Sequence, residues 1–243
     1  MKATISADII SSTSLSSKEL VVLSETINGA FNVIEEHLSK KQQSFWGRIV
    51  KGDTIECVFD SPQYALWSAL VLKVSILLKT SSWKSKVDAV KKSKGFEYFL
   101  LYGIRLAIGV GELRLVDKNM GIIDGDAIYK SGRKISEFST SGKERIIIKD
   151  TLYFVSGDKR MDLAMNTMLS FVDVLLKKST NKQMQVLYHK LLGLKDAEIA
   201  SSLGLGVSTV YKHSTLLGWN AISEMLDFYE NSNFENNLYT MKT

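Results

Sequence analysis

The sequence predicts an α/β (α+β) domain followed by an all-α domain that contains a helix–turn–helix. Up to residue 155, short apolar runs typical of strands alternate with longer stretches of helical periodicity. From residue 156 to residue 230 only helical periodicity is found, interrupted by a short turn that contains glycine. We therefore place the domains at residues 1–155 and 156–230. Residues 231–243 are polar and rich in asparagine, and we expect them to form a disordered tail.

Each element expected in the first domain has a local signal. Two strand patterns flank the tight turn Lys51-Gly52-Asp53, and Ser61-Pro62 favours a helix start because proline is tolerated in the first turn. The expected order is strand Thr4–Ile10, helix Ser17–Ser39, strands Phe45–Val50 and Thr54–Phe59, helix Ser61–Leu78, strand Gly103–Val110, hairpin Gly111–Met120, helix Asp126–Ser139 and strand Arg145–Ile148. This order, with its antiparallel hairpin, is that of a ferredoxin-like sheet rather than of a Rossmann fold. Neither a P-loop nor GxGxxG is present, and Gly109-Val110-Gly111 indicates close backbone packing at a strand end.

In the second domain, helices at Asp158–Ser179 and Asn181–Leu192 are expected to precede a helical pair. The first helix of the pair spans Lys195–Leu203, and Gly204 and Gly206 allow a short turn. Ser208 and Thr209 are expected as N-cap residues of the second helix. We expect its buried side to be formed by Val210, Leu216 and Leu217.

The outward side of this second helix is the predicted DNA-binding surface, because a recognition helix contacts bases and phosphates through residues near its N-terminus. The predicted residues are Ser208, Thr209, Tyr211, Lys212, Ser214 and Thr215. The alternative is a helical hairpin used only for packing or dimerisation.

Composition limits the class of protein. The 243 residues are 45% hydrophobic and 23% charged, as in soluble globular proteins, and the single cysteine, Cys57, suits a reducing compartment. The N-terminus has no secretory pattern, and the apolar stretch Tyr64–Leu78 is too short to span a bilayer and contains Lys73. We therefore expect a cytoplasmic protein without a membrane partner.

The second domain has no net positive charge, which bears on how tightly it can bind DNA. Residues 156–243 contain nine Lys/Arg and nine Asp/Glu, so the excess of the chain's net +5 lies in residues 1–155. Phosphate neutralisation supplies most nonspecific affinity for DNA, so we expect weak binding by one copy and a contribution from dimerisation.

Three further groups of residues bear on the search for binding sites. Residues 79–94 contain six lysines and Trp83, which favours a solvated helix over a nucleic-acid-binding insertion. The three histidines show no metal-ligand spacing. Ser12, Thr13 and Ser14 precede a helix, where they could bind phosphate or simply cap the helix.

The segment EIASSLGLGVSTV resembles the helix–turn–helix of sigma-factor region 4 and of LuxR-type regulators. The resemblance covers about fifty residues, within the stretch 181–230. It implies DNA as a partner, and the likeness to a sigma factor adds RNA polymerase as a candidate partner.

The first domain carries a second resemblance. The segments ADIISSTSLS, GRIVKGDTIECVFDSPQYAL, RLAIGVGEL and GIIDGDAIYKSGRKISEFSTSG are similar, in this order, to motifs of class III nucleotidyl cyclases, and the whole chain resembles the SatD-like family. The cyclase resemblance implies that Asp8 and Asp53 hold Mg²⁺ or Mn²⁺ and that Arg133 stabilises charge on the α-phosphate. It also implies a homodimer in which Arg133 faces the Asp8 and Asp53 of the other copy.

Several positions depart from the cyclase pattern. Tyr129 replaces the asparagine that orients the ribose, Ile49 replaces the lysine that reads the purine, and Ile122 replaces the polar partner of that lysine. Isoleucine cannot make the hydrogen bonds that select adenine. Lys51 lies in the expected turn and is a poor substitute.

These features favour a DNA-binding transcriptional regulator in which a degenerate cyclase-like domain senses a ligand such as a nucleotide. One alternative is an active metal-dependent nucleotidyl cyclase with an unusual base preference. Another is a non-enzymatic adaptor that uses both domains as docking surfaces.

Overall fold

The computed structural model describes residues 1–50, 52–84, 93–137 and 148–234. Its centre is a five-stranded sheet in the order β2-β3-β1-β4-β7. The strands are β1 (Lys2–Ile9), β2 (Phe45–Val50), β3 (Thr54–Phe59), β4 (Ile104–Gly111) and β7 (Leu152–Val155). Neighbouring strands are antiparallel except β4 and β7, which are parallel. The chain is therefore a mixed α/β protein, as the strand and helix patterns predict.

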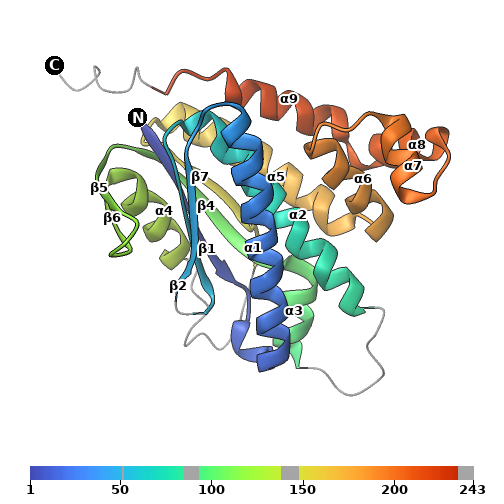
Figure 1. Ribbon diagram of the computed structural model, residues 1–243, viewed down its shortest axis with the longest axis horizontal. Helices are drawn as coiled ribbons and strands as arrows, with labels where there is room; N and C mark the ends of the chain where they lie inside the picture. The colour runs from blue at the N-terminus through green and yellow to red at the C-terminus, as the bar shows by residue number, and fades with distance from the viewer. Residues whose placement is uncertain (51, 85–92, 138–147, 235–243) are drawn as a thin grey trace.

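Helices cover both faces of the sheet (Figure 1). On one face lie α1 (Ser17–Lys40) and α2 (Ala65–Lys84), the latter preceded by the short helix η2 (Pro62–Tyr64). On the other face α4 (Asp126–Glu137) packs against β1 and β4. A separate hairpin of β5 (Leu113–Asp117) and β6 (Ile122–Gly125) extends beside α4. The predicted hairpin, Gly111–Met120, contains β5 but ends before β6.

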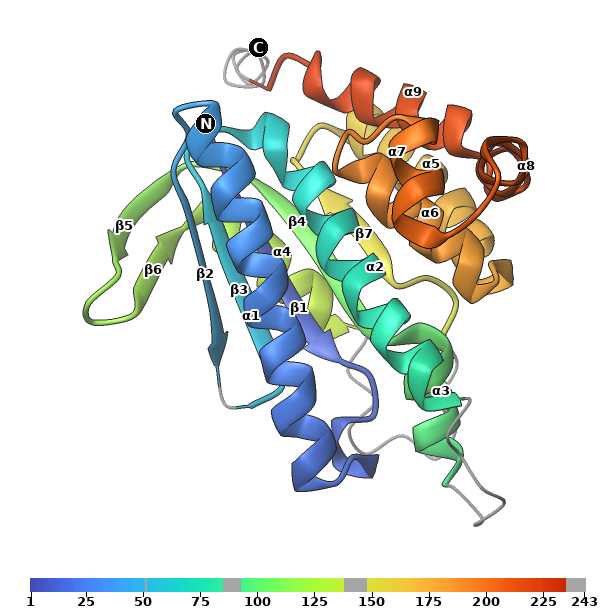
Figure 2. The same cartoon turned by 45° about the vertical axis from the view of Figure 1, so that its right-hand side comes forward.

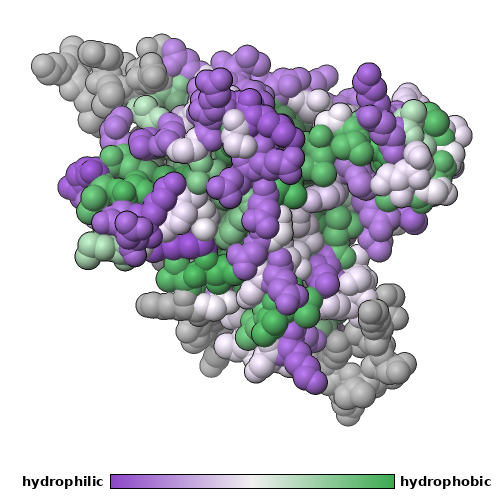
Figure 3. Space-filling view, viewed as in Figure 1, coloured by the Kyte–Doolittle hydropathy of each residue, from purple (hydrophilic) through white to green (hydrophobic). Residues whose placement is uncertain are grey.

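Local chemistry explains where α1 begins and which side it buries. The side chain of Ser16 accepts a hydrogen bond from the backbone N–H of Glu19, and the backbone N–H of Ser16 donates to the carboxylate of Glu19, which forms a capping box. Residues 12–14 form a separate short helix, η1 (Ser12–Ser14), so they do not cap α1. The side of α1 away from the sheet is a run of hydrophilic residues (Figure 3).

Two elements among residues 1–155 differ from the prediction. The expected strand Arg145–Ile148 falls largely outside the described residues, and Ile148 is not in a strand. The fifth strand is β7, which lies further along the chain. An unexpected helix, α3 (Lys94–Tyr102), begins at Ser93, whose side chain accepts from the backbone of Phe96. Only part of the lysine-rich stretch 79–94 lies within the described residues.

The segment Pro62–Trp83 is the one helix of the described chain that is long and apolar enough to cross a membrane by length and composition. Within its most apolar stretch of 18 residues, 67% is buried inside the fold, as is usual for a core helix. Lys73 lies on this helix, is 1% exposed and donates hydrogen bonds to the carbonyl of Tyr102 (2.7 Å) and the hydroxyl of Thr151 (2.6 Å). These contacts make α2 the central helix between the sheet and the C-terminal helices.

The remaining helices are α5 (Lys159–Lys178), α6 (Asn181–Leu191), α7 (Asp196–Leu203), α8 (Val207–Leu217) and α9 (Trp219–Glu230). Figure 2 shows α5 and α6 beside β7 and α2, with α7 and α8 further from the sheet. Buried residues of α5, α6 and α9 belong to the same apolar core as the sheet and α2. A second, smaller core joins Val186 of α6, Ile199 and Ala200 of α7, and Val210 of α8. The domain boundary after residue 155 stays a prediction.

Candidate functional site

The two carboxylates predicted to bind metal ions lie at adjacent ends of two neighbouring strands, Asp8 in β1 and Asp53 in the turn before β3. Asp8, near the end of β1, is opposite Thr54 of β3, and Asp53 directly precedes Thr54. The backbone N–H of Ile9 donates to the carbonyl of Asp53 at 3.0 Å. The pairing of β1 with β3 therefore brings together residues that are 45 positions apart, from 8 to 53 in the sequence.

Asp8 already has a counter-ion. Arg105 of β4 donates through Nε to Oδ1 at 3.0 Å and through Nη2 to Oδ2 at 2.7 Å, a bidentate ion pair. Arg105 is 4% exposed, so Asp8 balances a buried charge. A cation at Asp8 would compete with this guanidinium for both oxygens.

Asp53 is held by the loop after β1. Ser12 donates its hydroxyl to Oδ2 at 2.9 Å, and Thr54 donates to Oδ1 at 3.5 Å. Within the described ranges there is no group of three or more His, Cys, Asp or Glu side chains that could hold a metal ion. The predicted site has two carboxylates only, and the metal assignment stays a prediction.

The loop predicted to bind phosphate makes its own internal bonds. Ser14 donates its hydroxyl to the carbonyl of Ser11 at 2.7 Å, while Thr13 is exposed. Ser11 adopts a left-handed conformation with φ of 54°, which lets the chain turn sharply after β1. Ser12 is occupied by Asp53, so Thr13 is the predicted phosphate ligand that is most exposed to solvent.

Arg133 lies on α4, on the same sheet face as Asp8. Alternation along β1 places Thr4 and Ser6 on this face, and both hydroxyls are hydrogen-bonded to Ser131 of α4, at 2.9 and 2.8 Å. Arg133 is exposed and its guanidinium is 5.8 Å from the ring centre of Tyr129. No described hydrogen bond or ion pair joins it to Asp8 or Asp53, so the three predicted residues do not form one contact cluster within this chain.

Arg133 instead lines a cleft between α4, β7 and α5 with a volume of about 390 Å³. Lys130 crosses one end of it and donates to the carbonyl of Val110 at 2.9 Å and to Asp126 at 2.6 Å. Tyr129 donates its hydroxyl to Asp124 of β6. Tyr129 therefore links the β5–β6 hairpin to α4. Its hydroxyl would have to leave Asp124 in order to bind a ribose.

The positions that replace the purine-reading pair are separated. Ile49 faces the apolar core under α1, and its strand partner Ile55 is fully buried. Ile122 is 36% exposed on the hairpin. On the opposite face of β2, Arg48 makes a hydrogen-bonded ion pair with Glu56 (Nε to Oε2, 2.8 Å) and also bonds the carbonyl of Gly121. Lys51 lies outside the described residues.

Sequence reasoning missed Arg105, Arg48 and Glu56. A charged residue inside the apolar run Gly103–Val110 is the signal that could have found Arg105, because a buried arginine needs an anionic partner. Arg48 and Glu56 are opposite one another across the β2–β3 hairpin, a spacing that the predicted strands already contained.

In the second candidate site, α7 and α8 are joined by a short turn. Gly204 has φ of 63°, and the backbone N–H of Leu205 reaches back to the carbonyl of Ala200 at 2.9 Å. The N-cap of α8 is Gly206, so the prediction that Ser208 and Thr209 cap this helix is wrong. Both residues lie in its first turn.

The exposed side of α8 differs in two residues from the predicted surface. Ser208, Tyr211, Lys212 and Thr215 are exposed and Thr209 is half-buried. Ser214 is 6% exposed and donates to the carbonyl of Tyr211, so it does not face outward. Leu216, predicted to be buried, is 62% exposed, while Val210 and Leu217 are buried.

Comparison with known proteins gives a distant likeness. No protein-family model matches the chain, and no curated protein matches it. Two solved structures of a bacterial light-regulated adenylyl cyclase resemble it at 16% and 17% identity, with TM-scores of 0.40 and 0.39. Each alignment covers 65% of this chain and 44% of the other, so the chain matches less than half of that protein's length.

Proposed function

We propose that this protein is a DNA-binding regulator and that α7, the glycine turn and α8 form a helix–turn–helix. The observation that carries the proposal is the packing of α8. Its inner side, at Val210, joins the small core with α6 and α7, while its outer side presents Ser208, Tyr211 and Lys212 from the first turns. A helix held in this way can enter a major groove with its N-terminal residues leading.

The charge of this surface agrees with contact to phosphates. The sequence of α8, VSTVYKHSTLL, contains Lys212 and no acidic residue, and its N-terminus carries the positive end of the helix dipole. Lys212 is one cation only, so we expect each copy to bind weakly and two copies to be needed for tight binding.

We further propose that the sheet with α1, α2 and α4 is a non-catalytic, cyclase-like domain that senses a ligand. The Asp8–Arg105 ion pair supports this proposal because it occupies one of the two carboxylates that cyclase chemistry needs. Ile49 supports it as well, because a residue turned into the core cannot read a base.

DNA binding can be tested with the full chain and a fluorescent duplex of mixed sequence. We expect the observed affinity to fall as salt rises, and the double variant Tyr211→Ala/Lys212→Ala to bind more weakly, with a salt slope smaller by about 0.9 for each lost phosphate contact. The matched control is Lys18→Ala, which removes an exposed lysine of α1 far from α8 in sequence.

The outcomes separate the alternatives. Binding that does not depend on salt, or that both variants weaken equally, would contradict the proposal. Absence of DNA binding together with recovery of a protein bound through the exposed Val207 and Leu216 would favour the adaptor.

The enzymatic alternative has its own test. Incubation with the four NTPs and Mn²⁺, followed by mass spectrometry, is expected to give no cyclic nucleotide from the wild type or from Asp53→Ala. A cyclic nucleotide and pyrophosphate from the wild type alone would replace the sensor by an active cyclase and would identify its base.

A further inference from the structure

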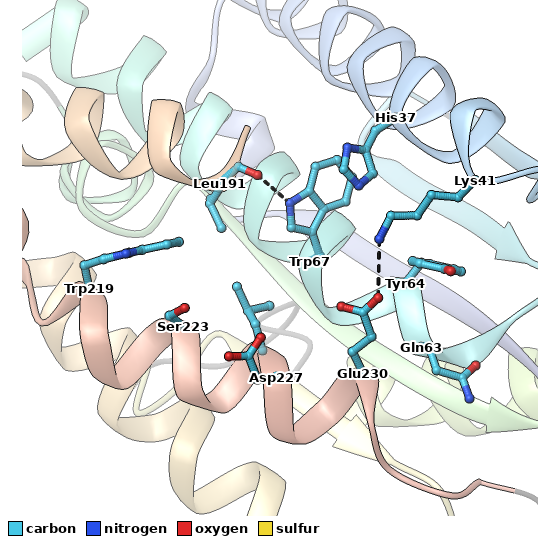
Figure 4. A pocket seen from close by; sticks show the side chains of 11 residues that line it. His37, Lys41, Gln63, Tyr64, Trp67, Leu191, Trp219, Ser223, Asp227 and Glu230 are labelled. Atoms are coloured by element: carbon cyan, nitrogen blue, oxygen red, sulfur yellow. Dashed lines mark hydrogen bonds and ion pairs between the residues drawn. The ribbon is translucent and has the colours of Figure 1, made fainter. Parts of the chain in front are cut away.

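A small pocket lies where the C-terminal helices meet α1 and α2, apart from both sites described above (Figure 4). Its volume is about 190 Å³. Three aromatic side chains line it: Tyr64 of η2, Trp67 of α2 and Trp219, the first residue of α9. The pocket is thus built from segments that are far apart in the sequence.

The aromatic wall is fixed in place by contacts of its own. The ring of His37 stacks on Trp67 with centroids 4.1 Å apart and planes inclined by 24°. The indole Nε1 of Trp67 donates to the carbonyl of Leu191, at the end of α6, at 2.7 Å. The stacking contact and the hydrogen bond both exist without a ligand. The ring of Trp67 therefore needs little rearrangement when a ligand binds.

The opposite wall carries two carboxylates of α9. Glu230 forms an ion pair with Lys41 at 3.3 Å, and the ammonium of Lys41 is 4.8 Å from the ring centre of Tyr64. Among the described residues, none makes a hydrogen bond or ion pair with the carboxylate of Asp227, which Figure 4 shows on the side of α9 facing Trp67. Lys41 balances one carboxylate, and one negative charge is left over.

His37 does not supply the missing positive charge. Burial lowers the pKa of its imidazole, and the nearby Lys41 and Lys40 lower it further, against the opposite influence of Glu230. The neutral ring is therefore favoured at neutral pH, and the pocket combines aromatic faces with an unbalanced carboxylate.

We propose that this pocket binds a small organic cation, such as an alkylammonium or quaternary ammonium compound. The rings of Trp67 and Trp219 attract a cation through their quadrupoles, the ring of Tyr64 already faces the ammonium of Lys41, and Asp227 provides the counter-ion. A volume of 190 Å³ equals that of roughly six water molecules at about 30 Å³ each, which excludes a nucleotide and suits a compound of few atoms. The ligand is thus of a different class from the nucleotide considered for the sheet, and the inference does not depend on DNA binding.

The test titrates choline into the full chain at constant ionic strength and follows tryptophan fluorescence, because Trp67 and Trp219 lie in the pocket. The matched ligand is 3,3-dimethylbutan-1-ol, which has the shape of choline without its charge. We expect saturable binding of choline, at least about tenfold weaker binding of the alcohol, and a loss of about tenfold in Asp227→Asn and in Trp219→Leu. Glu224→Gln, which removes an exposed acid from the same helix outside this pocket, is expected to bind choline like the wild type.

Three results would overturn the proposal. Equal binding of choline and the alcohol would show an apolar crevice without cation recognition. Equal effects of Asp227→Asn and Glu224→Gln would show a general charge effect. A fluorescence change that does not saturate, in a protein whose circular dichroism is unchanged, would show that choline does not occupy the pocket.

Discussion

Lys73 links elements that are distant in the sequence, and its charged form is disfavoured by burial. Its ammonium is fully buried and donates to Tyr102, Ile104 and Thr151, which lie at the end of α3, at the start of β4 and just before β7. Thr151 in turn donates its hydroxyl to the buried Asp173 of α5 at 2.6 Å. Burial lowers the pKa of Lys73 to about 8, although Asp173 acts in the opposite direction.

This pKa predicts how stability depends on pH. An unfolded lysine has a pKa of about 10.4. Between pH 8 and about 10 the unfolded chain therefore holds the Lys73 proton while the folded chain releases it, and the free energy of unfolding rises with pH. Urea unfolding of Lys73→Met should lack this rise. At pH 7 the variant should also be less stable by roughly 2–4 kcal/mol, because buried acceptors and Asp173 lose their cation.

The comparison for this prediction is Lys79→Met, on the same helix but only half-buried. We expect it to keep the pH dependence of the wild type. If Lys73→Met and the wild type had parallel stability curves between pH 7.5 and 9.5, the proton would not leave Lys73 in the folded protein.

The residue scale is also where sequence reasoning was weakest. The motifs place Asp8 and Asp53 together, and the β1–β3 register does bring them to neighbouring strands. The partner of Asp8 could not be read from the motif, since Arg105 is 97 positions away and its role depends on the β1–β4 register. The inward turn of Ile49 likewise follows from strand alternation against α1 rather than from the identity of the residue.

At the scale of elements, close packing of α4 on β4 gives a sharp prediction. A Cβ at Gly109 would lie 2.2 Å from the carbonyl oxygen of Ala127 and 2.8 Å from the amide nitrogen of Ser131. Both atoms belong to the backbone of α4, so the helix would have to move. We expect Gly109→Ala to lower the free energy of unfolding by about 2–3 kcal/mol or more, measured by urea denaturation.

Gly29, in the middle of α1, provides the matched glycine. A Cβ there meets nothing within 4 Å, so Gly29→Ala should raise stability by roughly 0.5–1 kcal/mol through helix propensity alone. Equal effects of the two substitutions would mean that α4 does not approach β4 as closely as the structure places it.

The elements with strong local signals were predicted well. The bounds of β2 and β3 agree with the expected strands, and the Gly109–Gly111 pattern does mark close packing. The strand β7, whose four residues pair with β4 in parallel, was not predicted. The predicted strand Arg145–Ile148 lies largely outside the described residues. The helix α3 was missed because its nine residues are fewer than the roughly 11–18 over which helical periodicity is read.

At the scale of the whole molecule, the sequence pattern predicts an α/β part followed by an α part, whereas one hydrophobic core contains residues of both. Met165 and Leu169 of α5, Leu187 of α6 and Met225 of α9 belong to the same buried cluster as the strands. Polar contacts follow the same pattern, since Asp173 accepts from the amide of Leu152 at 3.1 Å and Asn166 bonds both the N–H and the carbonyl of Phe154. Hydrophobic periodicity identifies which residues are buried, but not whether two halves share one core.

A truncation decides whether the boundary after residue 155 separates folding units. A chain of residues 1–155 would lose the partners of Leu152 and Phe154 in β7 and expose the apolar surface that α5, α6 and α9 cover. We therefore expect the full chain to unfold in one cooperative thermal transition and residues 1–155 to show none, whereas residues 1–234 should unfold like the full chain. Circular dichroism and scanning calorimetry measure both. A sigmoidal transition of residues 1–155 near that of the full chain would make the sheet an independent domain, and the helices would then be an appended module rather than a part of its core.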